Sequence, residues 1–173
     1  MKAAYLKEKR NIVIRDDRPV PEPAEDQVLV KMEYCGVCGS DVHFYREGKV
    51  GDTDAPKDFI LGHEVAGTVV KTGAKVTSLV PGDRVALEPG YTCGKCEFCK
   101  TGKYNLCPDV QFFAAPPVAG ALQEYVVHPA DMCFKLPDNV STEEGALVEP
   151  LAVGMHAASQ AGVTLGNRVL ILG

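Results

Sequence analysis

The stretch of sequence that decides the fold is Cys93-Gly94-Lys95-Cys96-Glu97-Phe98-Cys99-Lys100-Thr101-Gly102-Lys103-Tyr104-Asn105-Leu106-Cys107. Four cysteines in one short loop can surround a single zinc ion with a tetrahedron of thiolates, the closed ligand shell of structural zinc sites. Iron–sulfur loops begin with the same spacing, and unligated thiols are the other alternative, so the spacing alone does not decide. The surrounding chain does, and it indicates zinc.

Three further segments carry the remaining metal-binding side chains, namely Cys35-Gly36-Val37-Cys38-Gly39-Ser40-Asp41-Val42-His43, Gly62-His63-Glu64 and Val148-Glu149-Pro150. Two cysteines at this spacing can also form a redox pair, but that interpretation requires a thioredoxin-like βαβ setting, which the sequence lacks. Taken singly, His63 or Glu149 is more often structural than a ligand. Together the segments offer a thiolate, an imidazole and carboxylates, a donor set for a catalytic zinc ion with one open position.

Length and composition limit the classes of protein that the sequence can represent. The 173 residues suffice for one domain and part of another, and 46% hydrophobic residues indicate a packed core. A net charge of -5 argues against a nucleic-acid partner. No apolar run reaches the ~18 residues of a membrane span, and the first residues have no secretory apolar core, so a cytoplasmic protein is expected. Because the cytoplasm is reducing, the seven cysteines favour metal ligation over disulfides.

Short apolar runs broken by glycine, proline and aspartate fill the first 140 residues and predict a β-rich barrel. The expected strands are residues 28–32, 65–70, 84–87, 123–127 and 132–136. Ser141-Thr142-Glu143-Glu144 is a capping box that predicts a helix, interrupted at Glu149-Pro150 and resumed over residues 151–161. The run from Arg168 to Gly173 predicts a buried strand. The predicted fold class is therefore mainly β with helical additions (α+β).

In their order along the chain, these motifs resemble those of the zinc-dependent medium-chain alcohol dehydrogenases. The likeness includes Gly62-His63-Glu64, Pro81-Gly82-Asp83-Arg84-Val85 and Gly102-Lys103-Tyr104-Asn105. Within that family, the run at residues 39–43, Phe112-Phe113-Ala114-Ala115-Pro116-Pro117 and the stretches 135–140 and 144–151 are most similar to the sorbitol and xylitol (polyol) dehydrogenase branch. The resemblance implies a GroES-like, partly open β-barrel catalytic domain.

The resemblance also implies two zinc sites. Cys93, Cys96, Cys99 and Cys107 would hold a structural ion, and Cys38, His63 and Glu64 a catalytic one. Glu149 would lie beside the catalytic metal, either holding its water or exchanging with Glu64 as ligand, a choice that the sequence leaves open. His63 and Glu64 would face opposite ways in a flat strand, so both reach one metal only if the chain bends at Gly62.

The remaining implied roles concern the substrate. Ser40 would contact the substrate hydroxyl and pass on its proton, and Asp41 would hydrogen-bond a ligand imidazole. His43 is a candidate for the proton relay or, equally, a packing residue. Substrate contacts are expected from Phe44, Tyr45, Phe113 and Glu149. Phe44 stands where the branch often has tyrosine, so a substrate-contacting hydroxyl is either lost or supplied by Tyr45.

The resemblance implies NAD as cofactor, with NADP not distinguished, a small polyol as substrate, no nucleic-acid or membrane partner, and a homo-oligomer, a tetramer, for the full-length protein. Residues 1–150 would form the catalytic domain, and residues 151–173 a linking helix and the first strand of a dinucleotide-binding domain, with Gly173 as its first phosphate-loop glycine. We expect residues 1–173 alone to lack turnover. The alternatives are a threonine or butanediol dehydrogenase domain and a non-catalytic zinc-binding module.

Overall fold

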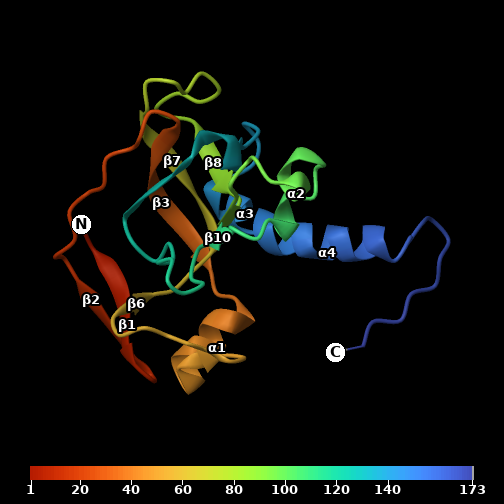
Figure 1. Ribbon diagram of the computed structural model, residues 1–173, viewed down its shortest axis with the longest axis horizontal. Helices are drawn as coiled ribbons and strands as arrows, with labels where there is room; N and C mark the ends of the chain where they lie inside the picture. The colour runs from red at the N-terminus through yellow and green to blue at the C-terminus, as the bar shows by residue number, and fades with distance from the viewer. Residues whose placement is uncertain (173) are drawn as a thin grey trace.

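A five-stranded antiparallel sheet with the order β11-β3-β7-β8-β12 lies at the centre of the structure (Figure 1). The computed structural model describes residues 1–172. The strands of this sheet are β3 (Gln27–Gly36), β7 (Glu64–Thr72), β8 (Arg84–Leu87), β11 (Tyr125–Pro129) and β12 (Cys133–Lys135). Its apolar side chains form the main core, in which Val28, Val30, Val69 and Val85 are almost fully buried. The sheet does not close into a barrel among the described residues, so the predicted mainly β, partly open architecture is confirmed.

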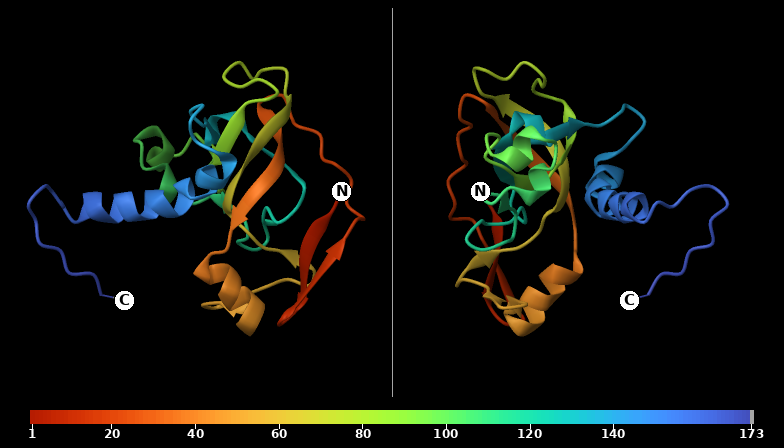
Figure 2. Two further views of the ribbon diagram at one scale, coloured as in Figure 1. Left: turned by 180° about the vertical axis from the view of Figure 1, so that it is seen from behind. Right: turned by 45° about the vertical axis from the view of Figure 1, so that its right-hand side comes forward.

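A second sheet with the order β2-β1-β6 lies beside the lower part of the first (Figures 1 and 2). It consists of β1 (Ala3–Glu8), β2 (Asn11–Arg15) and β6 (Phe59–Ile60). Two short hairpins pair β4 (Lys49–Val50) with β5 (Thr53–Asp54), and β9 (Gly90–Tyr91) with β10 (Gln111–Phe112). The sequence reasoning missed the β1–β2 hairpin.

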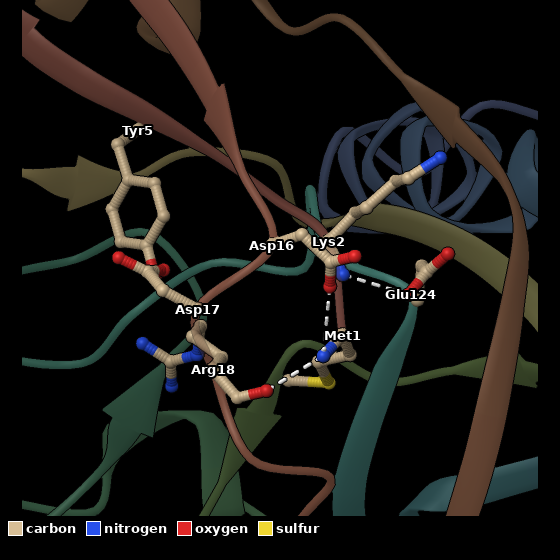
Figure 3. A network of polar contacts seen from close by, with 7 residues as sticks. All are labelled: Met1, Lys2, Tyr5, Asp16, Asp17, Arg18 and Glu124. Carbon is tan, nitrogen blue, oxygen red and sulfur yellow. Dashed lines mark hydrogen bonds and ion pairs between the residues drawn. The ribbon is translucent and has the colours of Figure 1, made fainter.

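The amino terminus ties this second sheet to the first (Figure 3). The Met1 ammonium donates to the carbonyl oxygen of Arg18 at 2.6 Å and lies 3.2 Å from the Asp16 carboxylate. The next backbone N–H, that of Lys2, donates to Glu124 at 2.7 Å, just before β11. These contacts hold β1 in register against the chain that enters the five-stranded sheet.

The helices are α1 (Gly39–Glu47), α2 (Glu97–Lys100), α3 (Thr142–Ala146) and α4 (Val148–Gln160), with the 3₁₀ turns η1 (Tyr104–Leu106) and η2 (Ala130–Met132). The predicted capping box is present, since the Ser141 hydroxyl accepts from the Glu144 N–H and Glu144 accepts from the Ser141 N–H. The helix break was predicted at Glu149-Pro150 and falls instead at Leu147. Pro150 occupies the first turn of α4, where its missing N–H would have no intrahelical partner.

Two polar anchors hold α3 against the sheet. The Glu33 carboxylate on β3 accepts from the Thr68 hydroxyl on β7 at 2.8 Å and from the Thr142 hydroxyl on α3 at 2.7 Å. The Arg84 guanidinium on β8 donates to the carbonyl oxygens of Pro137, Asp138 and Val140 in the loop before α3. The position of α3, and so the root of α4, is therefore fixed by two strands and a loop.

Beyond its root, α4 projects away from the sheets, and none of its residues is buried (Figures 1 and 2). The strand predicted from residue 168 onward is not formed in residues 168–172, where Leu170, Ile171 and Leu172 are 81–88% exposed. A strand needs a hydrogen-bonded neighbour, and within residues 1–172 none lies beside this segment. Gly173 lies outside the described residues. Among residues 1–172, no helix is both long enough and apolar enough to cross a membrane.

Candidate metal centres and substrate pocket

The cysteine loop brings its four sulfur atoms together as the sequence predicts. The Sγ–Sγ distances are 3.4 Å for Cys96–Cys99, 3.6 Å for Cys93–Cys107 and 4.0 Å for Cys93–Cys99. These distances are far longer than a disulfide bond of ~2.05 Å. They lie on both sides of the sulfur–sulfur distance of about 3.8 Å that a tetrahedral zinc ion with Zn–S bonds of ~2.3 Å requires. The donor set therefore fits one tetrahedral zinc ion.

The protonation preference of one thiol in this loop also suits metal binding. A hydrogen bond from the Thr92 side chain lowers the pKa of Cys99 to about 6, and contacts with the neighbouring thiols and the Gly94 backbone act in the same direction. A thiolate, rather than a thiol, is the form that ligates metal. The loop thus favours the ligating form of Cys99 near neutral pH.

A second set of donors converges where β3 and β7 meet α1. The ligand atoms of Cys38, His63 and Glu64 all lie within 4.8 Å of one another. His63 and Glu64 are both largely buried, with 7% and 9% of their surfaces exposed. Ligand atoms on one zinc ion lie about 3–4 Å apart, so these three side chains could share a single ion. A thiolate, an imidazole and a carboxylate on three sides leave a fourth position for another ligand.

The predicted bend at Gly62 is what lets His63 and Glu64 face the same point. Gly62 has a φ of +92°, a conformation that L side chains rarely adopt. A Cβ atom there would lie 2.7 Å from the Cys35 sulfur and 2.8 Å from Leu122 Cγ. Burial raises the pKa of Cys35 to about 12, so this thiol stays protonated and packs beneath the bend.

Asp41 joins the two segments that carry the donors, but not by the contact expected from the sequence. Its carboxylate accepts from the backbone N–H of Cys38 at 3.0 Å and from that of Gly62 at 2.9 Å. Its Oδ1 lies 3.9 Å from His63 Nδ1, too far for a hydrogen bond. Among residues 1–172, no hydrogen-bond partner reaches this buried Nδ1. Asp41 therefore fixes the main chain on both sides of the site instead of the imidazole.

Glu149, in the first turn of α4, lies near this group but outside the converging set of three. Burial raises its pKa; the charges of Glu64 and Glu88 act in the same direction, and His63 opposes them. Glu149 and Glu88 both line a cavity of about 800 Å³ between β8, the cysteine loop and α4. Tyr104 of the cysteine loop places its hydroxyl 3.4 Å from Glu88 Oε2 in the same wall. The structure thus has Glu64 in the converging set and Glu149 beside it.

A smaller pocket of about 230 Å³ opens beside His63. Its walls include three of the expected substrate residues, Ser40, Phe44 and Phe113. Ser40 and Phe44 reach it together because they are four residues apart on one face of α1. The other lining residues are Val50, Thr53, Phe112, Ala114, Ala115 and Pro116.

Phe112 is a site residue that the sequence reasoning did not assign. Its ring packs against the His63 imidazole with the centroids 5.6 Å apart, and it lines the same pocket. Its neighbour Phe113 was assigned because the two belong to one family-like motif, and both rings are in fact used. Strand β10, which carries Phe112, is too short to be read from periodicity.

Besides Glu149, which lines the larger cavity, two residues expected to act on the substrate or its proton do not line this pocket. The Tyr45 hydroxyl donates to the Arg10 carbonyl oxygen at 3.1 Å, on the side of α1 away from Ser40. His43 is exposed and does not line the pocket. Each is one residue from Phe44 and is therefore turned by about 100° from it around the helix, in opposite directions. Tyr45 therefore does not supply a hydroxyl to the pocket, which corrects that expectation.

His128 on β11 supports the pocket wall from behind. Its side chain is fully buried, its Nε2 lies 2.7 Å from the Glu88 carbonyl oxygen, and its ring packs on Phe113 with centroids 4.8 Å apart. Burial lowers the pKa of His128 to about 4. The imidazole is therefore neutral at physiological pH and donates one hydrogen bond while filling the core.

Acidification is expected to destabilise the wild-type domain more steeply than a His128→Gln variant. Unfolded histidine titrates near 6.5, so between that pH and about 4 only the unfolded state takes up the proton. The contribution is complete above pH 6.5 and is lost as the pH falls, by up to about 1.4 kcal/mol per pH unit. Urea unfolding at several pH values from about 7 to about 4.5 measures this slope. A His156→Gln variant, which changes an exposed histidine on α4, is the control and should keep the wild-type slope. Equal slopes in His128→Gln and wild type would contradict the assignment.

Comparison with known proteins places the chain in a family. Residues 24–138 match the alcohol dehydrogenase GroES-like domain, and the chain belongs to that family. Its sequence is 54% identical over 158 residues to sorbitol dehydrogenase from Gallus gallus, which covers 91% of this chain and 44% of that protein.

Solved structures agree with this assignment. An oxidoreductase/dehydrogenase of unknown specificity from Escherichia coli superposes with a TM-score of 0.89 at 49% identity, over 96% of this chain and 48% of that one. The 2R,3R-butanediol dehydrogenase of Bacillus subtilis gives a TM-score of 0.81 at 34% identity, over 96% of this chain and 49% of that one. The chain thus spans about half the length of the relatives it matches.

Proposed function

We propose that this chain is the catalytic domain of a zinc- and NAD-dependent polyol dehydrogenase of the sorbitol and xylitol type, which oxidises a secondary alcohol to a ketone. The observation that carries the proposal is the convergence of Cys38, His63 and Glu64 beside a pocket lined by Ser40. A non-catalytic zinc-binding module would need neither this pocket nor a donor set with an open position. The identity to a sorbitol dehydrogenase supports the substrate class.

In this proposal Cys38, His63 and Glu64 hold the catalytic zinc, and Cys93, Cys96, Cys99 and Cys107 hold a structural one. When bound, zinc would supply Lewis acidity at the substrate hydroxyl, and NAD would accept the hydride. Ser40 contacts the substrate hydroxyl and relays its proton, releasing its own hydroxyl proton to water as it takes up that of the substrate. Phe44, Phe112 and Phe113 exclude water from the carbon beside that hydroxyl. Asp41 keeps Cys38 and Gly62 in place through their backbone N–H groups.

Glu149 is proposed to act from outside the ligand set. Its raised pKa, caused first by burial, and its place in the wall of the larger cavity suit a group that holds a water beside the metal. Glu64 is then the resident carboxylate ligand, since it alone of the two lies in the converging set.

The cofactor would be held by a part of the protein other than residues 1–172, in which no parallel sheet with a phosphate-binding loop is present. Residues 1–150 are assigned to the catalytic domain and residues 151–173 to the connection, although α4 already begins at Val148. The assignment of Gly173 to the cofactor-binding loop stays a prediction. The tetrameric assembly of the full-length protein also stays a prediction. Residues 1–173 alone are proposed to lack turnover. Seven reduced thiols suit the cytoplasm as the setting.

A 2,3-butanediol dehydrogenase is the second candidate, because the pocket is mostly apolar. Of its lining side chains only Ser40, Thr53 and His63 are polar, and Tyr45 is turned away. A substrate with few hydroxyl groups would leave fewer hydrogen bonds unmade there. The structural likeness to a butanediol dehydrogenase points the same way.

The native full-length protein, assayed with NAD and matched concentrations of sorbitol, xylitol, 2,3-butanediol and threonine, separates these candidates. We expect kcat/KM for sorbitol or xylitol to exceed that for butanediol by about tenfold or more, a difference of ~1.4 kcal/mol in transition-state binding. Ser40→Ala should lower kcat by about 10²-fold or more with little change in zinc content, as for the loss of a proton-transfer group. A preference for butanediol or threonine would overturn the substrate assignment, and two bound zinc ions without turnover of any of the four would overturn the proposed activity.

A further inference from the structure

Gly36 lies directly opposite Glu64, the carboxylate of the proposed metal site. The two residues are cross-strand partners at the end of the β3–β7 pairing. Side chains of directly opposed residues share one face of a sheet and lie close together. Whatever stands at position 36 therefore determines how much space the Glu64 side chain has.

The space that the absent side chain leaves is filled by the Glu64 carboxylate. A Cβ atom built on Gly36 would lie 2.2 Å from Glu64 Oε2, 3.3 Å from its Cδ and 3.0 Å from its Cβ. Non-bonded carbon and oxygen atoms do not approach to 2.2 Å, so the carboxylate could not stay where it is. The position of the Glu64 oxygen thus depends on residue 36 being glycine.

Backbone conformation does not explain this glycine. Gly36 is absent from the set of described residues with positive φ, so alanine can adopt its main-chain geometry. The shortest contact, with Oε2, is at the far end of a flexible side chain that can rotate away. The 3.0 Å contact with Glu64 Cβ is relieved only if β3 and β7 shift apart by a few tenths of an ångström. An added methyl group would therefore displace the carboxylate by far more than it displaces the strands.

We propose that Gly36 is a positioning residue that keeps the Glu64 carboxylate turned toward Cys38 and His63. It does so by leaving empty the volume that the carboxylate occupies, so that Glu64, and not Glu149, is the carboxylate in contact with the metal. This inference rests on the proposed metal site at Cys38, His63 and Glu64.

Cobalt titration of the metal-free native protein tests the inference without an activity assay. The visible absorption band that disappears in Cys38→Ser identifies the site, and competition with a chelator gives its affinity. Gly36→Ala is expected to weaken cobalt binding at this site by about 10- to 100-fold, the range found when groups that orient metal ligands are changed. The band should also shift, because the carboxylate leaves or rotates, while thermal unfolding of the metal-free protein stays close to wild type.

Gly39→Ala is the matched control, since it makes the same chemical change three residues along. A Cβ atom at Gly39 meets nothing within 4 Å, and its φ is not in the left-handed region. Its cobalt affinity should stay within about twofold of wild type. In a Glu64→Ala background, Gly36→Ala should add no more than about twofold, because the group through which it acts is gone.

The outcomes separate this inference from the proposed function. If wild-type protein shows no cobalt band that depends on Cys38, the proposed metal site fails. If that band is present and Gly36→Ala leaves both its position and the affinity unchanged, the positioning role fails alone. It also fails if Gly36→Ala weakens binding equally without Glu64, or if it unfolds the protein, because the inference requires the side chain to yield far more than the strands.

Discussion

In the full-length protein proposed above, Cys38→Ser is expected to release one of the two proposed zinc ions and to abolish the proposed dehydrogenase turnover, while the other ion stays in place. The three side chains at residues 38, 63 and 64 share one candidate site, and the four-cysteine loop is a separate one. Losing a thiolate leaves an imidazole and a carboxylate, too few protein ligands for a catalytic zinc site. Metal analysis of the purified protein should fall from about two equivalents to about one. Lewis acidity is worth several kcal/mol of barrier, so turnover should fall by at least about 10³-fold.

Cys35→Ser provides the matched control for this experiment. Cys35 lies three residues earlier, packs beneath Gly62 and does not belong to the converging set of the described residues. Its variant should keep two zinc equivalents even if it unfolds more easily. A folded Cys38→Ser protein that loses both ions would show that the two sets of donors have been wrongly assigned.

Cys96→Ala is expected to disorder the loop from residue 93 to residue 107 while leaving the five-stranded sheet intact. Neither α2 nor η1 contains a buried residue, and in the loop only Cys107 is counted in the core. The loop therefore has no apolar core of its own, and metal binding must supply its stability. Zinc contributes about 10–16 kcal/mol to the folding of small zinc-finger peptides.

Limited proteolysis and far-ultraviolet circular dichroism together measure this effect. Cleavage should appear within residues 93–107, and the strand signal should persist because the sheet pairs without the loop. Cys133→Ala is the control, because Cys133 is buried in the main core and burial raises its pKa to about 12. That variant should lose some stability and no metal. Unchanged protease resistance of Cys96→Ala after chelation would rule out a structural ion in the loop.

The sequence predicted those strands whose pattern is local. The expected ranges 65–70, 84–87 and 132–136 overlap β7, β8 and β12, and the Ser141 capping box overlaps the start of α3. The β1–β2 hairpin and the short strand β6 were missed, because β6 has two residues and pairs with β1 more than fifty residues away. Helix α1 was missed because only Asp41 and Phe44 of its nine residues are buried, which gives no helical periodicity.

The candidate site shows the same division between local and long-range information. The donors of both metal groups could be named from spacing and resemblance, and the bend at Gly62 followed from the adjacency of His63 and Glu64. The contacts of Asp41 and the direction of Tyr45 could not be predicted in this way, since they depend on how α1 is rotated against Gly62 and against Arg10, which lie far from α1 in the sequence. The crowding at Gly36 depends on cross-strand register, which one strand alone does not specify.

Leu147 lies between the anchored helix α3 and the projecting helix α4, so it is the point about which α4 would rotate. Thirteen residues of helix extend about 20 Å, whereas Glu149 sits only ~3 Å along the axis from the pivot. A swing of the outer end is therefore reduced roughly sixfold at Glu149. Because Glu33 and Arg84 brace the root of α4, the position of Glu149 beside the proposed metal site is set mainly by α3 and the five-stranded sheet.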